Sequence, residues 1–174
     1  MKIAICGKMC SGKSTLANHI MRQFDGYQIY SFGQKVKELC VELFNMKHKD
    51  RTLLINFANK MRDIDPDVWI NQVLKQTSQK QNCIVDDVRY QNEVDALIRD
   101  GWKIIHLQVP LHIQKQRIMK LYPNNYQDHL DARSHISEQN QFIFPEGYPN
   151  MILDTSDHNM EQIKHDINMF ILKQ

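Results

Sequence analysis

The stretch Gly7-Lys8-Met9-Cys10-Ser11-Gly12-Lys13-Ser14 decides the fold class of this chain. It has the spacing G-x-x-x-x-G-K-S/T of a phosphate-binding loop, in which glycines let backbone N–H groups turn inward around phosphate oxygens. The lysine of such a loop reaches the β and γ phosphates, and the serine hydroxyl is a ligand for Mg²⁺. The sequence therefore predicts that residues 7–15, Thr15 included, bind ATP, that Lys13 is catalytic and that Ser14 contacts Mg²⁺.

The residues on either side of this loop support the same prediction. The apolar run Ile3-Ala4-Ile5-Cys6 precedes the loop, as a buried strand would, and residues 15–21 have the pattern of an amphipathic helix. The first turn of that helix would direct the positive end of its dipole at the phosphates. This order of strand, loop and helix argues against a chance match on a surface loop.

Length and composition limit the classes of protein to consider. A chain of 174 residues corresponds to about one domain, predicted here as residues 1–174. Its 22 basic and 20 acidic residues are spread along the chain, which argues against a nucleic-acid arm or a membrane-binding basic cluster. The four cysteines lack the C-x-x-C spacing of a metal site and fit a reducing compartment. No apolar run approaches the about 18 residues of a membrane span, and no signal-peptide pattern is present. We expect a cytoplasmic protein whose partners are small-molecule nucleotides, with no nucleic acid and no membrane.

Strand-like apolar runs alternate with helical patterns along the chain. The alternation predicts an α/β fold, the three-layer sandwich of a P-loop NTPase, in which helices cover both faces of a five-stranded parallel sheet. Between the second and third strands, residues 33–80 carry three helical stripes, and we assign the acceptor-binding region to them. The first stripe includes Leu43 and Phe44 on its core-facing side, and the second helix starts near Asp50 as its N-cap. A further helix is predicted from about His112 to Met119, before the polar stretch. Residues 121–129 are polar and without a clean period, so we predict a mobile flap within a small lid at about 117–140. The predicted strands are 2–6, 27–32, 82–86, 103–109 and 150–153.

Two aspartates follow the third apolar run, at the carboxyl end of a predicted strand. Asp86 and Asp87 therefore lie where open α/β sheets hold their ligands, and a carboxylate there can orient Mg²⁺ or its waters. Alternation along the strand sends the two side chains to opposite sides, so we expect only one to face the metal. The alternative is a structural role, with Asp87 and Asn92 as caps of the following helix.

Asp87-Val88-Arg89, followed by Tyr90, Asn92 and Glu93, resembles the strand end of the phage-type deoxynucleoside monophosphate kinases. These are a branch of the P-loop nucleoside monophosphate kinase superfamily, and further matches extend the resemblance over nearly the whole chain. Asp86 departs from the pattern, because the family often has a small or hydroxylated residue there. The further matches are Ser31-Phe32-Gly33 before Lys35, Arg62 followed by Trp69, the lid element His135-Ile136-Ser137-Glu138 and the adenine-side stretch after Leu153.

The resemblance implies transfer of the γ-phosphoryl of MgATP to a deoxynucleoside 5′-monophosphate. Arg62 and Arg89 would grip the acceptor phosphate, since a guanidinium binds it in a bidentate fork. Arg117 and Arg133 border the predicted lid and would close over the γ-phosphate, neutralising charge and excluding water. The implied catalytic residues are Lys13, Arg89, Arg117 and Arg133, and the implied acceptor residues are Phe32, Lys35, Arg62, Trp69, Asp87 and Arg89.

Several alternatives stay open at this stage. Trp69 and Phe32 are as well suited to core packing as to stacking on a base. A kinase of the same architecture with another phosphorylated acceptor, as in the similar animal phosphomevalonate kinases, differs only in the acceptor pocket. A nucleotide-gated binding protein would use the loop without transfer, and a polynucleotide 5′-kinase would need a basic groove that the balanced charge does not support. The resemblance is also compatible with a homodimer.

Overall fold

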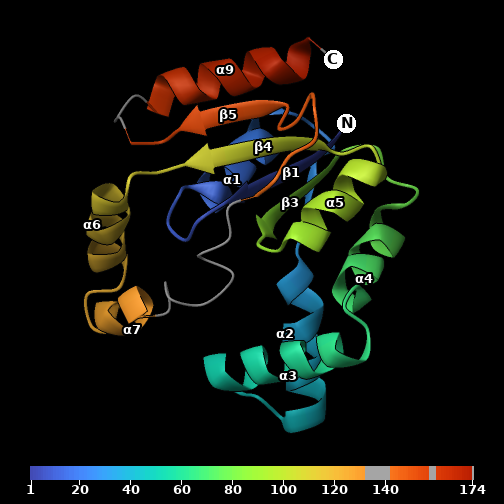
Figure 1. Cartoon of the computed structure of the whole chain (residues 1–174), viewed down its shortest axis with the longest axis vertical. Coiled ribbons are helices and arrows are strands. Elements are labelled where there is room, and N and C mark those ends of the chain that lie inside the picture. Colours follow the sequence, from blue (N-terminus) through green and yellow to red (C-terminus); the bar gives the residue numbers. More distant parts are fainter. Residues whose placement is uncertain (132–141, 157–159, 174) are drawn as a thin grey trace.

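The computed structural model describes residues 1–131, 142–156 and 160–173, and a parallel sheet lies at its centre (Figure 1). The strand order is β2-β3-β1-β4-β5, with every neighbouring pair parallel. All five predicted strands are confirmed, with ends shifted by one or two residues, and β3 extends through both aspartates. The strands are β1 Lys2–Gly7, β2 Gln28–Tyr30, β3 Cys83–Val88, β4 Lys103–Gln108 and β5 Met151–Asp154.

Alternate residues of the central strand build two separate cores. Ile3 and Ile5 pack on one face with α1 (Lys13–Gln23) and α9 (Met160–Leu172), which also contact each other. Ala4 and Cys6 pack on the other face, in a core that includes α5 (Gln91–Arg99). A strand with both faces buried has few positions for polar side chains, which explains its continuous apolar run. The predicted three-layer P-loop NTPase sandwich is confirmed.

Three helices connect β2 with β3 and extend beyond the sheet. They are α2 (Phe32–Phe44), α3 (Arg51–Ile64) and α4 (Val68–Thr77). As predicted, Asp50 caps α3, accepting a hydrogen bond from Leu53 N at 2.9 Å. The prediction that Leu43 and Phe44 face the core is wrong, because both are more than half exposed. These two residues end α2 where it has passed the edge of the sheet (Figure 1), and Phe44 there contacts the Phe57 ring of α3, with 5.8 Å between the ring centroids, instead of a sheet layer.

Two helices follow β4 on the opposite side of the molecule from α4. Helix α6 (Leu111–Leu121) was predicted, but residues 126–131 were assigned largely to a mobile flap, whereas the structure forms α7 (Tyr126–Asp131) there. The rings of Tyr122 and His129 stack at 3.6 Å and fix α7 on α6. Since α7 buries only His129, it carries no hydrophobic period for the sequence to reveal. Among the described residues, no helix combines the length and hydropathy needed to cross a membrane.

Candidate active site

The phosphate-binding loop leaves the carboxyl end of β1, between β3 and β4. Parallel sheets bind ligands at such a point, where the chain continues to opposite sides of one strand. Gly7 has no room for a side chain, because a Cβ there would lie 2.6 Å from the Leu107 carbonyl oxygen. The loop ends at Gly12, which has a left-handed φ of 100° and precedes α1. Helix α1 has no acidic residue in its first turn and no side-chain cap within the described chain, so its N-terminus suits an anion.

Side chains from outside the loop bind three of its consecutive carbonyl groups. Gln114 Nε2 donates to Met9 O at 2.9 Å, and Arg117 Nη1 donates to Cys10 O at 3.3 Å. Thr155 Oγ1 lies 3.0 Å from Ser11 O and donates to it. In a trans peptide, C=O and the next N–H point in opposite directions, so the N–H groups of Cys10 and Gly12 turn to the other side of the loop. The loop is held in a form that presents donors to phosphate.

Lys13 and Ser14 lie at the start of α1, next to the end of β3. The Lys13 ammonium donates to the carbonyl oxygens of Gly7 and Lys8, each at 2.7 Å, and so lies along the loop. The Ser14 hydroxyl shares a hydrogen bond with the Asp86 carboxyl. Burial raises the pKa of Asp86, and the bond to Ser14 opposes that rise. A hydroxyl and a carboxylate that meet in this way can share one cation.

Asp87 faces the opposite side of β3 and binds the start of α2. Its carboxylate accepts hydrogen bonds from Ser31 Oγ at 2.7 Å, Phe32 N at 3.0 Å and Gly33 N at 2.9 Å. The prediction that the two aspartates face opposite sides is confirmed. The metal and acceptor assignments of Asp87 stay predictions, and in this structure both of its oxygens accept hydrogen bonds at the start of α2. The alternative role as a cap of α5 is wrong, because Asp87 binds N–H groups at the start of α2, next to the N-cap residue Ser31.

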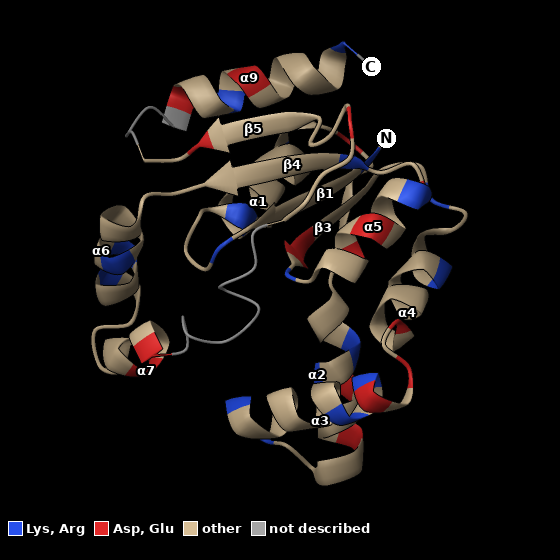
Figure 2. Ribbon diagram, in the orientation of Figure 1, with Lys and Arg blue, Asp and Glu red and all other residues tan. Residues whose placement is uncertain are grey.

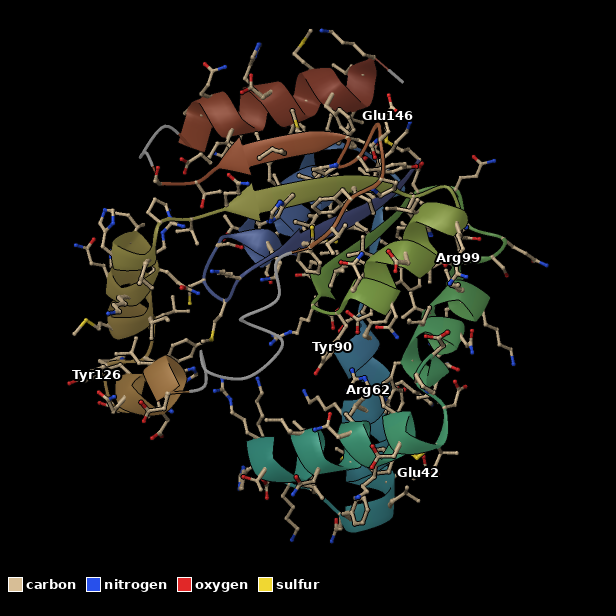
Figure 3. The ribbon with its side chains drawn as sticks, in the orientation of Figure 1. Glu42, Arg62, Tyr90, Arg99, Tyr126 and Glu146 are labelled. Carbon is tan, nitrogen blue, oxygen red and sulfur yellow. The ribbon has the colours of Figure 1, made fainter. Side chains whose placement is uncertain are left out.

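The turn after β3 brings the predicted acceptor arginines together. Glu93 Oε2 accepts hydrogen bonds from Arg89 N at 2.7 Å and Tyr90 N at 3.0 Å. Its other oxygen lies 3.8 Å from the guanidinium of Arg62, which also lies 4.7 Å from the centre of the Tyr90 ring (Figure 3). Burial raises the pKa of Glu93 to about 7, although the two N–H groups and Arg62 favour its charged form. The buried carboxyl of Glu93 therefore links the guanidinium of Arg62 in α3 to the backbone N–H groups of the turn that contains Arg89.

The sequence and the fold were compared with known proteins. A family model described as an AAA domain matches residues 3–141, which is most of the chain. The chain belongs to the AAA domain family. Within this family assignment the loop at residues 7–14 is a nucleotide-binding P-loop. No curated protein matches the sequence.

Solved structures share the fold of this AAA domain over almost its full length. The protein TT1252 from Thermus thermophilus is 15% identical, with a TM-score of 0.58, covering 99% of this chain and 97% of that one. Shikimate kinase from Aquifex aeolicus is 16% identical, with a TM-score of 0.54 and coverage of 99% and 97%. Shikimate kinase from Bacteroides thetaiotaomicron is 15% identical, with a TM-score of 0.53 and coverage of 100% and 99%. These likenesses support a P-loop kinase-like fold and do not single out the deoxynucleoside monophosphate kinases.

Two aromatic residues predicted for the acceptor site lie in the core of the AAA domain. Trp69 and Phe32 are 3% and 4% exposed, and the Trp69 indole donates to Ala58 O at 3.2 Å. Stacking on a base needs an open ring face, so packing is the role that this geometry supports. Lys35 is half-buried and pairs with Glu38 at 3.3 Å.

The predicted lid residues are only partly described. Arg117 lies in α6, donates hydrogen bonds to Cys10 O and to Thr155, and keeps its assignment to the γ-phosphate as a prediction. Its partners are the outer side of the P-loop and the residue after β5, so the guanidinium is already engaged by the domain itself. Arg133 and the element His135-Ile136-Ser137-Glu138 lie outside the described residues.

Several residues of the site were not found by sequence reasoning. Gln114 lies on the buried face of α6, one turn before the buried Ile118. A glutamine at a buried position is unusual, and this could have indicated a specific hydrogen bond from the sequence. Thr155 follows the last residue of β5, within the stretch after Leu153 that the family resemblance assigns to the adenine side, and its contact with the P-loop was not predicted. Arg51, at the start of α3, donates a hydrogen bond to His129 of α7 at 3.0 Å and so joins α3, in the predicted acceptor-binding region, to α7. Burial and the nearby Arg51 lower the pKa of His129, which favours the neutral ring that this bond needs.

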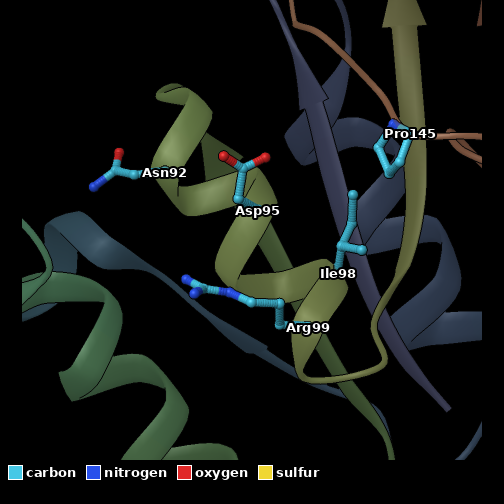
Figure 4. Close-up of a pocket in the computed structure, with 5 residues that line it drawn as sticks. All are labelled: Asn92, Asp95, Ile98, Arg99 and Pro145. Carbon is cyan, nitrogen blue, oxygen red and sulfur yellow. The ribbon is translucent and has the colours of Figure 1, made fainter.

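Figure 2 shows Lys and Arg on α3, on α6 and at the start of α1, three elements around the loop after β1. A separate surface pocket of about 350 Å³ lies against the outer side of α5 (Figure 4). Because none of its lining residues belongs to the P-loop or to the arginine pair, we do not assign it to the active site. Its lining residues are Asn92, Asp95, Ile98, Arg99 and Pro145.

Proposed function

We propose that this protein transfers the γ-phosphoryl group of MgATP to a deoxynucleoside monophosphate. The bond between the γ-phosphorus and the bridging oxygen of ATP breaks, and a phosphate oxygen of the acceptor bonds to that phosphorus, giving ADP and a deoxynucleoside diphosphate. One observation carries the proposal. The guanidinium of Arg62 reaches the turn that ends β3, in which Arg89 is the first residue after the strand, and β3 lies beside the strand that carries the P-loop.

The donor half fits a triphosphate. Gly7 leaves no space for a side chain, the braced carbonyls turn N–H groups to the other side of the loop, and α1 presents an uncapped N-terminus among the described residues. The Ser11 hydroxyl is fully buried and has no hydrogen-bond partner in the described chain. Because buried polar groups are normally hydrogen-bonded, this hydroxyl is available to bind a ligand in the loop. Lys13, held on loop carbonyls, would exchange those partners for phosphate oxygens, which bind an ammonium more strongly.

Ser14 and Asp86 are the residues that would hold Mg²⁺. Within the described chain no group of three or more His, Cys, Asp or Glu is arranged to hold a metal. That fits Mg²⁺ in a kinase, which takes one or two protein ligands and completes its shell with water and phosphate oxygens. When bound, the ion would neutralise charge on the β and γ phosphates.

The acceptor half favours an acceptor that is already anionic. Guanidinium groups bind phosphate in a bidentate manner, and a phosphate oxygen needs no general base to attack. The two nearest carboxylates beside the arginines serve other purposes, since Asp87 holds α2 and Glu93 holds the turn. This supports a phosphorylated acceptor over an alcohol.

The experiment is an acceptor panel with purified protein and MgATP. The panel contains the deoxynucleoside and ribonucleoside monophosphates, phosphomevalonate, and shikimate because shikimate kinases share the fold. Chromatography of the products identifies which compound gains a phosphoryl group. A deoxynucleoside diphosphate as the main product supports the proposal, whereas phosphorylated shikimate or diphosphomevalonate would replace it with a kinase for that acceptor.

A nucleotide-gated binding protein is the rival from another class. It predicts ATP binding, nucleotide-dependent binding of a partner and no phosphorylated acceptor in the panel. A homodimer stays a prediction from the family resemblance, and sedimentation of the purified chain tests it.

A further inference from the structure

The P-loop is braced from outside by two uncharged side chains of different elements. Gln114 comes from α6 and Thr155 from the segment after β5, and each donates to a loop carbonyl. We infer that Gln114 and Thr155 are positioning residues that hold the loop in its phosphate-binding form and so set the affinity for ATP. The inference rests on the ATP-binding part of the proposed function and does not depend on the acceptor.

Thr155 connects three elements of the site. Its hydroxyl lies 3.0 Å from Ser11 O and 3.1 Å from Gln108 O, and accepts a hydrogen bond from Arg117 Nη1 at 3.0 Å. Its backbone N–H donates to Gln108 O at 2.9 Å, and its carbonyl oxygen accepts from Arg117 Nη2. The side chain is 5% exposed, so water cannot easily replace these partners. Thr155 thereby fixes the loop to the end of β4 and to α6.

Gln114 supplies the second brace from a buried position. Its side chain is 1% exposed, and a buried amide is unfavourable unless it is hydrogen-bonded. An apolar residue of similar size would fill the same space in α6 next to Ile118. The amide adds the hydrogen bond to Met9 O, so Gln114 acts on the conformation of the P-loop and not only on the packing of α6.

The residue between the braces explains why the loop needs them. Cys10 has a left-handed φ of 59°, which side-chain-bearing residues rarely adopt unless their surroundings impose it. Met9 O and Ser11 O, on either side of Cys10, are the carbonyls that Gln114 and Thr155 bind. Without these bonds the peptides on either side of Cys10 each lose an anchor, and a carbonyl that turned inward would oppose the phosphate. The braces therefore act on the anion site through the backbone.

The test compares two buried threonines whose hydroxyls donate to backbone carbonyls. Thr155→Val removes the brace, and Thr77→Val removes an equivalent bond to Val73 O, 2.9 Å, in α4. We expect Thr155→Val to raise the Kd for MgATP about tenfold, the value of one hydrogen bond, with Thr77→Val within about twofold of the unsubstituted protein. Both variants should lower Tm. Thr155→Ser, which keeps the hydroxyl, should restore the affinity.

Gln114→Met gives an independent measurement that keeps the packing volume. We expect a higher Kd for MgATP, measured by calorimetry, with an unchanged KM for the acceptor. Unchanged ATP affinity in both Thr155→Val and Gln114→Met, or an equal loss in Thr77→Val, would overturn the inference. Absence of ATP binding by the unsubstituted protein would overturn both proposals, whereas ATP binding without any transfer would overturn only the proposed kinase function.

Discussion

The donor side and the acceptor side of this site are built differently. On the donor side, loop carbonyls are bonded at 2.9 to 3.3 Å by Gln114, Arg117 and Thr155, and two of these three side chains are almost fully buried. On the acceptor side, α3 has Ala58 as its buried residue, and Arg62 reaches Glu93 at the longer distance of 3.8 Å. The donor side is therefore anchored in the core, while α3 on the acceptor side has one buried residue and a longer ion pair to hold it.

The two sides have different tasks: the donor side binds a triphosphate, and the acceptor side selects one compound. Every nucleoside triphosphate presents the same phosphates, so a rigid backbone loop serves them all. An acceptor has to be selected from similar compounds and then covered from water. Covering it requires a segment that can move, and such segments belong to the less stable parts of a protein. We expect substitutions on the donor side to affect all reactions alike, and those on the acceptor side to change one substrate at a time.

The largest effect is expected from Lys13→Ala. Loss of the ammonium should lower kcat by on the order of a hundredfold or more with every acceptor, as for other preorganised charge-stabilising groups. The fold should persist, because the hydrogen bonds that Lys13 donates to Gly7 O and Lys8 O lie within the loop itself. Initial rates of ADP formation measure the loss. Lys8→Ala, which removes an exposed lysine of the same loop, is the control and should keep near-normal activity.

A pH effect on stability is expected from Glu93. Its folded-state pKa of about 7 lies above the ordinary value of 4.5, so the native state binds more protons between these pH values. Stability should therefore fall as pH rises through that window, by up to roughly 3 kcal/mol, with Arg62 and Asp87 as the charges that face the group.

Urea unfolding from pH 4.5 to 8 measures this contribution. Glu93→Gln should flatten the pH dependence, because the amide oxygen can still accept from Arg89 N and Tyr90 N while nothing titrates. Asp63→Asn, an exposed change beside Arg62 in α3, should leave the slope as it is. A slope that survives in Glu93→Gln would show that another group causes it.

Arg62→Ala should act on the acceptor alone. We expect a rise in acceptor KM of about tenfold to a hundredfold, the range for hydrogen bonds to a charged group, with little change in the KM for ATP. Arg89→Ala should behave in the same way. Arg99→Ala, an exposed arginine of α5, is the matched control. Equal losses for ATP and acceptor would mean that the two sides of the site are not separate.

The smallest effect concerns the contact between α3 and α7. Arg51→Ala removes the hydrogen bond to His129 and should cost about 1 kcal/mol of stability. Hydrogen exchange in residues 122–131 should become faster, while exchange in β1 and β4 stays the same. Arg22→Ala, at an exposed position of α1, controls for the loss of charge. Unchanged exchange in α7 would mean that Arg51 does not hold it.

The sequence predicted the donor side better than the acceptor side, for physical reasons. A P-loop binds phosphate through its backbone, and Gly7, Gly12 and Lys13 reveal that backbone directly. The opposite orientations of Asp86 and Asp87 follow from strand alternation. The partner that Asp87 meets depends on where α2 begins after β2, which no local pattern encodes.

The residues that surround the loop were beyond local patterns for the same reason. Gln114 and Thr155 lie about a hundred or more residues from the carbonyls they bind, so only the folded sheet brings them together. Trp69 and Phe32 matched a family pattern at positions that the fold places in the core. The AAA domain family and the P-loop kinase-like fold follow from the loop motif and the sheet, whereas the identity of the acceptor depends on contacts that the spacing of motif residues does not determine.

The most direct measurement is the rate of ADP formation from MgATP with and without each deoxynucleoside monophosphate, using Lys13→Ala as the blank. Transfer to an acceptor predicts that at least one of these compounds raises the rate far above the acceptor-free value. ATP that binds tightly but is turned over at the same rate with every acceptor would contradict the account.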